Sequence, residues 1–243
     1  MSNITYLCVG GYTMTTNPYF IRARLFPTVL TAAPLLILVN KLVSNLYYDS
    51  LKSIFDILPI LTNLGLSAAL IFLSIQINRL LAKEIFQKLY FKEEIKMPTT
   101  NHLLWSDTFL ESTIKGKIRY KVKDKFGIEL MTPVEESQAE NKSRKQIVSA
   151  VSQIRNSLRD NRLLLQHNIE YGFFRNLIGG CVIAVLCSIA LLFIGISNND
   201  SGLRLTGIIL SSIYLVPIIF SKPLIKRFGN YYSKFLYEQF LTL

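Results

Sequence analysis

The sequence predicts an all-α membrane protein, with four transmembrane helices in two hairpins and a helical cytoplasmic module between them. Three observations support this fold class. Half of the 243 residues are hydrophobic and only 18% are charged, whereas a soluble domain carries about 25% charged residues. Four uncharged runs approach or exceed the roughly 17–25 residues that span a bilayer. Most of the positive charge lies between the second and third runs and near the termini.

The four apolar runs differ in length. Residues 57–78 and 176–199 form uncharged runs of 22 and 24 residues, long enough for a helix that spans the bilayer. Residues 205–221 form a run of 17, and residues 25–40 form a run of only 16. The first run spans if Lys41 snorkels outward and the helix continues beyond it. Otherwise this run forms a re-entrant or interfacial helix.

The distribution of Lys and Arg predicts the orientation and the domain organisation. The chain has a net charge of +11, and 24 of its 27 positive residues lie near the termini or between the second and third runs. The positive-inside rule therefore places both termini and the central loop in the cytoplasm. The expected parts are an N-terminal segment (1–24), a first hairpin (25–78), a basic helical module (79–175), a second hairpin (176–221) and a basic aromatic tail (222–243).

The composition argues against several function classes. Three cysteines, two histidines and no C-x-x-C leave no zinc-ligand pattern. The usual phosphate-loop, dinucleotide, nucleophile-elbow and metalloprotease motifs do not occur. No ionisable residue lies deep in an apolar run, which argues against a proton-coupled carrier. We therefore expect no catalytic residue, no metal site and no cofactor, and we do not predict an enzyme.

One face of the second apolar run is polar. Four residues spaced by four, seven and four positions share this face: Asn63, Ser67, Ser74 and Asn78. Such a face would line a water-filled pore if several copies of the chain assembled around it. Hydrogen bonding to neighbouring helices explains the same pattern. The third run has a face of small residues, Gly180, Ala184 and Ser188, which suits close helix packing within one chain or between copies.

The densest positive charge lies in residues 115–125. The candidate ligand-binding residues are Lys115, Lys117, Arg119, Tyr120, Lys121, Lys123 and Lys125. Six cations in eleven residues attract polyanions, and an aromatic ring among them can stack on a base. This pattern favours a site for a nucleotide or short nucleic acid, with salt-sensitive binding. The alternative is a solvated face near anionic lipid head groups.

Residues 110–126 carry two competing patterns. Apolar residues recur at every fourth position, as on a helix, whereas the cations alternate, as on a strand. Gly127 followed by Ile128 is typical of a helix C-terminus, and this favours the helix.

Further elements follow from local patterns. The sequence Thr132–Glu135 predicts a capping box with proline in the first helical turn. A later helix is expected from about Ser143 and should continue through Tyr171 into the third apolar run. The basic and aromatic tail predicts an interfacial amphipathic helix, or an extension of the fourth run.

Several stretches resemble a known bacterial family. They are Arg119–Tyr120–Lys121, Phe126–Gly127–Ile128, Thr132–Pro133 with Glu135–Glu136, Arg159–Asp160 and the run Asn168–Asn176. Together they resemble the small membrane effector of Hailong antiphage defence systems, over residues 99–180, a third of the chain. The resemblance implies a homo-oligomeric ion channel in the bacterial inner membrane. It also implies a nucleotidyltransferase partner, whose short DNA or nucleotide product controls opening. No ligand-binding residue is carried over.

These observations predict a ligand-gated, channel-type membrane effector. The alternative is a membrane anchor or scaffold that recruits a soluble cytoplasmic partner through residues 79–175. A small transporter or a lipid-modifying enzyme has less support, because the apolar runs hold no buried ionisable group.

Overall fold

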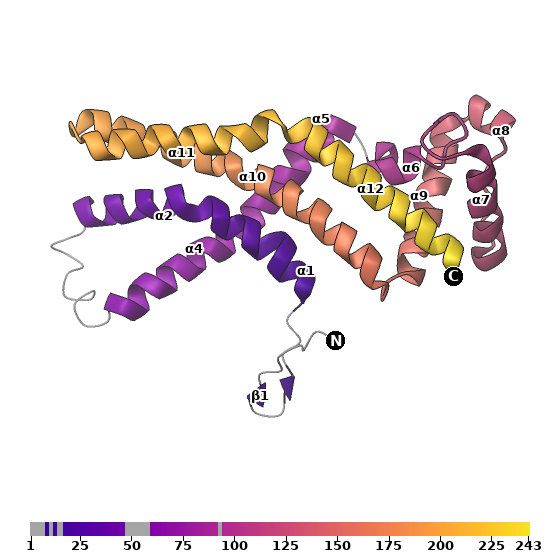
Figure 1. Ribbon diagram of the computed structural model, residues 1–243, viewed down its shortest axis with the longest axis horizontal. Coiled ribbons are helices and arrows are strands. Elements are labelled where there is room, and N and C mark those ends of the chain that lie inside the picture. Colours follow the sequence, from indigo (N-terminus) through magenta and orange to yellow (C-terminus); the bar gives the residue numbers. More distant parts are fainter. Residues whose placement is uncertain (1–7, 10–11, 14–16, 47–58, 92–93) are drawn as a thin grey trace.

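The protein is elongated and almost entirely helical. The computed structural model describes residues 8–9, 12–13, 17–46, 59–91 and 94–243. Within these ranges, extended structure is limited to a two-residue antiparallel pair, β1 (Cys8–Val9) and β2 (Tyr12–Thr13). Long apolar helices lie at one end of the molecule and a bundle of shorter helices at the other (Figure 1). The predicted all-α class is confirmed for the described residues.

Three helices are long and apolar enough to cross a membrane. The first, Pro18–Leu42, comprises α1 (Pro18–Phe20), a π-helical turn η1 (Ile21–Leu25) and most of α2 (Phe26–Leu46). The others are α10 (Arg162–Ser197) and α11 (Ser201–Ile219). The 19 residues of α11 extend about 28 Å, close to the roughly 30 Å of a bilayer core. Many large apolar side chains of α11 are exposed, as contact with lipid requires. The chain is therefore a membrane-embedded protein.

The predicted second span corresponds to α4 (Pro59–Leu81). The side chains of residues 59–64 and 66 lie outside the described part of the chain, and α4 is not among the three candidate spans. Four spans in two hairpins thus remain a prediction. The helix continues beyond this run, through a π-helical turn η2 (Ala82–Gln87) and α5 (Lys88–Phe91).

Helices α2, α4 and α10 pack closely around Gly180. A Cβ atom at this position would collide with Thr31 Oγ1 and would lie 2.7 Å from Asn78 Nδ2. The same Asn78 amide donates a hydrogen bond to Thr28 Oγ1 at 3.1 Å, joining α4 to α2. At Gly180, the small face of the third run therefore serves packing within the chain, one of the two expected alternatives.

The module contains η3 (Glu94–Lys96), α6 (Pro98–Asn101), α7 (Ser112–Phe126), α8 (Pro133–Gln138) and α9 (Glu140–Ser157). The helix predicted over 110–126 is confirmed as α7. It ends at Gly127, whose φ of 65° is a left-handed conformation that glycine adopts readily. The capping box is also confirmed, because Thr132 N donates to Glu135 Oε2 at 2.8 Å and Glu135 N donates to Thr132 Oγ1 at 3.4 Å.

The prediction of one continuous helix from Ser143 into the third run is wrong. A turn separates α9 from α10, because the Asn161 side chain caps the new helix and accepts a hydrogen bond from Leu164 N at 2.9 Å. Leu158, within this turn, is buried in the core of the module. From Arg162 onward, α10 runs for 36 residues without a break, so the module leads directly into an apolar span.

The C-terminal tail forms α12 (Ser221–Thr242), directly after α11 (Figure 1). Its side chains Leu236, Tyr237 and Phe240 are fully buried and share a core with Ile118 of α7 and Ile154 of α9. The tail therefore packs into the module, whereas its basic and aromatic composition predicted an interfacial helix or an extension of the fourth run.

Candidate functional site

The structure divides the predicted basic segment of α7 into buried and exposed cations. Lys115 and Arg119 are only 1% and 7% exposed. Lys115 Nζ donates to the Leu104 carbonyl at 2.6 Å and also to the carbonyl of Asp107. Burial lowers the pKa of Lys115. The hydrogen bonds of Lys115 are therefore made inside the module.

Arg119 is occupied in the same way. Its Nη2 lies 3.0 Å from Glu136 Oε2, and its Nη1 donates to the Met131 carbonyl at 2.7 Å. The guanidinium also lies over the Trp105 ring, 4.6 Å from the centroid. Burial lowers the pKa of Arg119, and the adjacent Glu136 carboxylate opposes this shift. Arg119 thus joins α7 to α8 and contributes little to the outer surface.

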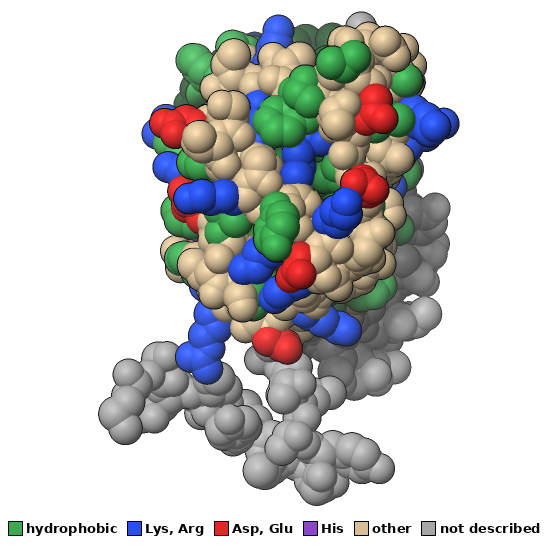
Figure 2. Space-filling view, turned by 90° about the vertical axis from the view of Figure 1, so that its right-hand side faces the viewer, with side chains coloured by type: hydrophobic (Ala, Val, Ile, Leu, Met, Phe, Trp, Pro, Cys, Tyr) green, Lys and Arg blue, Asp and Glu red, His purple; other side chains and the backbone are tan. Residues whose placement is uncertain are grey.

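The other predicted residues of this segment lie nearer the surface. They are Lys117, Tyr120, Lys121, Lys123 and Lys125. Lys121 Nζ donates to the Leu241 carbonyl at 3.0 Å, and Lys123 pairs with Glu129 at 2.5 Å. Figure 2 shows that Lys and Arg at this end of the molecule are interspersed with Asp and Glu. The exposed face therefore offers a ligand fewer free cations than the sequence predicted.

The polar face of α4 is partly used by packing. The side chain of Asn63 lies outside the described residues, and Ser67 is half-buried. Ser74 and Asn78 are buried, and the Asn78 amide is hydrogen-bonded to Thr28. The contacts of Asn78 favour the packing interpretation at this end of the polar face. A pore lined by the four residues remains a prediction.

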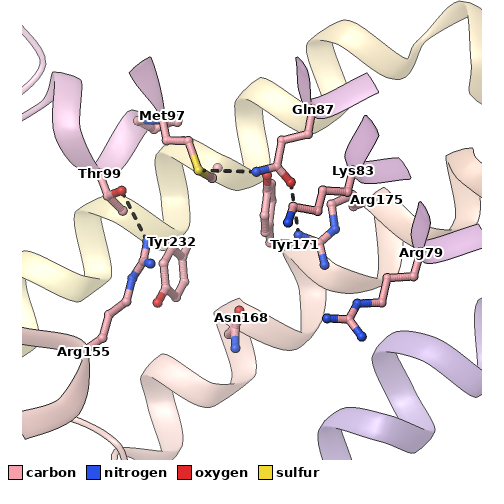
Figure 3. Close-up of a pocket in the computed structure, with 12 residues that line it drawn as sticks. Arg79, Lys83, Gln87, Met97, Thr99, Arg155, Asn168, Tyr171, Arg175 and Tyr232 are labelled. Atoms are coloured by element: carbon pink, nitrogen blue, oxygen red, sulfur yellow. Dashed lines mark hydrogen bonds between the residues drawn. The ribbon is translucent and has the colours of Figure 1, made fainter. Parts of the chain in front are cut away.

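A cavity of about 360 Å³, here called the junction pocket, lies where the apolar helices meet the module (Figure 3). Four cations line it: Arg79, Lys83, Arg155 and Arg175. No Asp or Glu is among its lining residues. A cavity whose charged side chains are all positive attracts anions. The junction pocket is therefore the strongest candidate site for an anionic ligand.

Helical spacing brings these side chains together from separate elements. Arg79, Lys83 and Gln87 follow one another at intervals of four along the end of α4 and η2. Asn168, Tyr171 and Arg175 are separated by three and four residues on α10 and so share one face of it. Arg155 of α9 and Tyr232 of α12 come from the opposite side of the pocket (Figure 3). A ligand held here would touch both the apolar helices and the module.

The pocket cations have few partners within the protein. Arg155 Nη2 donates to Thr99 Oγ1, and Arg175 Nη1 donates to Gln87 Oε1, each at 3.3 Å. The Nε atoms of both arginines are buried without an acceptor, and so is the hydroxyl of Tyr171 without any partner. Buried donors normally have a hydrogen-bond partner, so three groups without one beside the same cavity are unusual.

The junction pocket has no signature in the sequence that predicts it. Its residues come from segments spread between positions 79 and 232, so no local run of charge marks it. In the sequence, Arg79 directly follows one apolar run and Arg175 directly precedes another. The four-residue spacing of Arg79 and Lys83, directly after an apolar run, is the one local pattern that pointed to a cationic helix face.

Among the side chains that the structure describes, no group of three or more His, Cys, Asp or Glu is placed to hold a metal ion. Comparisons with family models, curated proteins and solved structures return no significant match.

Proposed function

We propose that this protein is a ligand-gated, channel-type membrane effector. It crosses the bacterial inner membrane four times, with both termini and the module in the cytoplasm, and it assembles as a homo-oligomer. The position of the junction pocket carries this proposal. The pocket is lined by the end of α4 with η2 and by α10, and the apolar part of α10 is long enough to cross a membrane. A ligand that binds there acts directly on the spans.

Gating would follow from a change in how these helices sit against the module. An anion between Arg155 of α9 and Arg175 of α10 favours the arrangement that brings the two cations together. Because α10 is unbroken from Arg162 to Ser197, a shift at Arg175 moves the apolar part of the same helix. The pore itself would form between copies, along the polar face of α4 that includes Ser67 and Ser74.

The resemblance to Hailong effectors supports a role in antiphage defence. Its most specific run, Asn168–Asn176, contains three residues that line the junction pocket: Asn168, Tyr171 and Arg175. In this proposal the ligand is a nucleotide or short DNA made by a nucleotidyltransferase partner.

Ion flux from liposomes tests the proposal. The purified protein is reconstituted, and potassium flux and membrane potential are followed with mononucleotides, with short oligodeoxynucleotides and without either. We expect flux that changes when one of these probes is added. The variant Arg155→Gln with Arg175→Gln should lose the response, while Arg159→Gln, an exposed residue outside the pocket, should keep it. Liposomes that stay impermeable under every condition would refute the channel.

The second candidate is a membrane anchor that recruits a soluble partner to the module. The hydrogen bond between Asn78 and Thr28 favours it, because one residue of the predicted pore face is already committed to packing. The test is affinity capture of cytoplasmic proteins by the membrane-reconstituted chain. Recovery of no specific partner would count against an anchor.

A further inference from the structure

We infer that the junction pocket binds the phosphate group of a small phosphorylated ligand. This inference deepens the proposed function, because it names the chemical group that the gating site recognises. It rests on three features of the pocket: the charge of its walls, the donors that the protein does not satisfy, and its size.

All the charged side chains that line the pocket are positive. Arg79, Lys83, Arg155 and Arg175 line one cavity, and no carboxylate lines it with them. None of these four cations forms an ion pair anywhere in the described ranges, in contrast to Arg119 and Arg144. Like charges held near one another repel, so an anion between them is favoured. Phosphate suits this arrangement because several of its oxygens accept charge-assisted hydrogen bonds at once.

The donors of the pocket exceed its acceptors. Arg155 donates to Thr99 and Arg175 donates to Gln87, both neutral side chains. Each guanidinium also lies near a tyrosine ring, that of Tyr232 or Tyr171. The Nε of each arginine is buried without an acceptor. Tyr171, only 6% exposed, adds a hydroxyl without a partner. Figure 3 shows the arginines approaching the cavity from opposite sides, with Tyr171 between them. A phosphate group accepts from such convergent donors and has no donor of its own that needs satisfying when it is fully ionised.

The size of the cavity limits the ligand. About 360 Å³ lies at the lower end of the roughly 300–1,000 Å³ of small-molecule sites. The Tyr232 ring, with the Arg155 guanidinium 5.7 Å from its centroid, and the Asn168 amide can contact the organic part of the ligand. Arg79 and Arg175 also adjoin the apolar runs, at the level where lipid head groups lie. The phosphate can therefore belong to a soluble metabolite or to a lipid, and the experiment must separate these sources.

The soluble source is tested by calorimetric titration of the full chain in nanodiscs of neutral phosphatidylcholine. The probes are inorganic phosphate, adenosine monophosphate, and adenosine as the matched compound without phosphate. We expect adenosine monophosphate to bind at least tenfold more tightly than adenosine. Arg155→Gln with Arg175→Gln should weaken its binding at least tenfold, and the exposed Arg79→Gln, which disturbs no core packing, should weaken it severalfold. Arg159→Gln, outside the pocket, should bind as the wild type does.

The lipid source is tested by adding phosphatidic acid to the nanodiscs. If the phosphate comes from lipid, phosphatidic acid raises the thermal unfolding midpoint of the wild type. It has no such effect on the double arginine variant, and the soluble probes do not bind.

The inference is supported if binding of the soluble probes, or stabilisation by phosphatidic acid, requires both the phosphate group and the pocket arginines. Equal binding of adenosine and adenosine monophosphate, no binding of inorganic phosphate and no effect of phosphatidic acid would together overturn it. Phosphate binding without ion flux would contradict the channel proposal alone. Ligand-gated flux that is indifferent to phosphate and to these arginines would contradict this inference alone.

Discussion

Removal of the Asn78 amide separates the two interpretations of the polar face of α4. Asn78 is 3% exposed and donates to Thr28 Oγ1 at 3.1 Å, between α4 and α2. A hydrogen bond between membrane helices contributes about 0.6 kcal/mol on average and at most about 1.7 kcal/mol. We therefore expect a coupling energy of about 0.6–1.7 kcal/mol between Asn78→Ala and Thr28→Ala. Reversible unfolding in mixed detergent micelles, measured for wild type, both single variants and the double variant, gives this energy directly.

The matched control is Ser67→Ala. Ser67 belongs to the same predicted face of α4, but it is half-buried and lies several turns before Asn78, the residue that contacts Thr28. Its effect should add to that of Thr28→Ala without coupling. The ion conductance of the Asn78→Ala protein should match that of the wild type, because packing holds the amide away from a pore. Zero coupling between Asn78 and Thr28, together with altered conductance, would refute this reasoning and place Asn78 in the pore.

Three further predictions concern the module. Glu136→Gln leaves Arg119 charged and buried without its carboxylate, so the free energy of unfolding should fall by about 3–5 kcal/mol; an unchanged thermal midpoint by circular dichroism would contradict this. Burial lowers the pKa of His102 from 6.5 to about 4. Between these pH values only the unfolded state binds the proton, so stability falls by about 3 kcal/mol as the pH drops. His102→Gln should remove that part of the loss. If denaturant titrations show that the wild type and the variant lose equal stability between pH 7 and pH 4, this role of His102 is excluded. Lys117→Glu with Lys121→Glu should weaken oligonucleotide binding and reduce its salt dependence; unchanged binding would leave this face of α7 without a ligand role.

Features with a local physical cause were predictable from the sequence. Gly127 ends α7 because the backbone there is left-handed, a conformation that glycine adopts readily and that bulky residues avoid. A glycine at the end of a helical pattern is visible in the sequence. Thr132 and Glu135 satisfy each other's backbone donors within four residues. The apolar helices α10 and α11 could be predicted from the length and composition of their runs alone.

Features that depend on distant partners were not predictable in this way. Lys115 is buried because carbonyls of residues 104 and 107, outside its own helix, accept its hydrogen bonds. A pattern of alternating charge cannot show which cations find such acceptors. The tail likewise carries the composition of an interfacial helix, yet Tyr237 and Phe240 fill the core between α7 and α9. The junction pocket combines both difficulties, since its cations meet only after α9, α10 and α12 have packed.

The contacts just below the pocket explain why ligand binding and the spans should be coupled. Asn176, next to Arg175 on α10, donates through Nδ2 to the Ala23 carbonyl of η1 at 2.6 Å. One turn earlier, a Cβ atom on Gly172 would lie 2.8 Å from the Tyr19 hydroxyl, so α10 and the N-terminal helix touch closely there as well. Two π-helical turns, η1 and η2, contact α10, and such turns are frequent at functional sites. Within α10 no flexible linker separates the pocket residues from the apolar part of the helix. Ligand binding therefore does not have to order a linker first, and its free energy can shift these helices against each other.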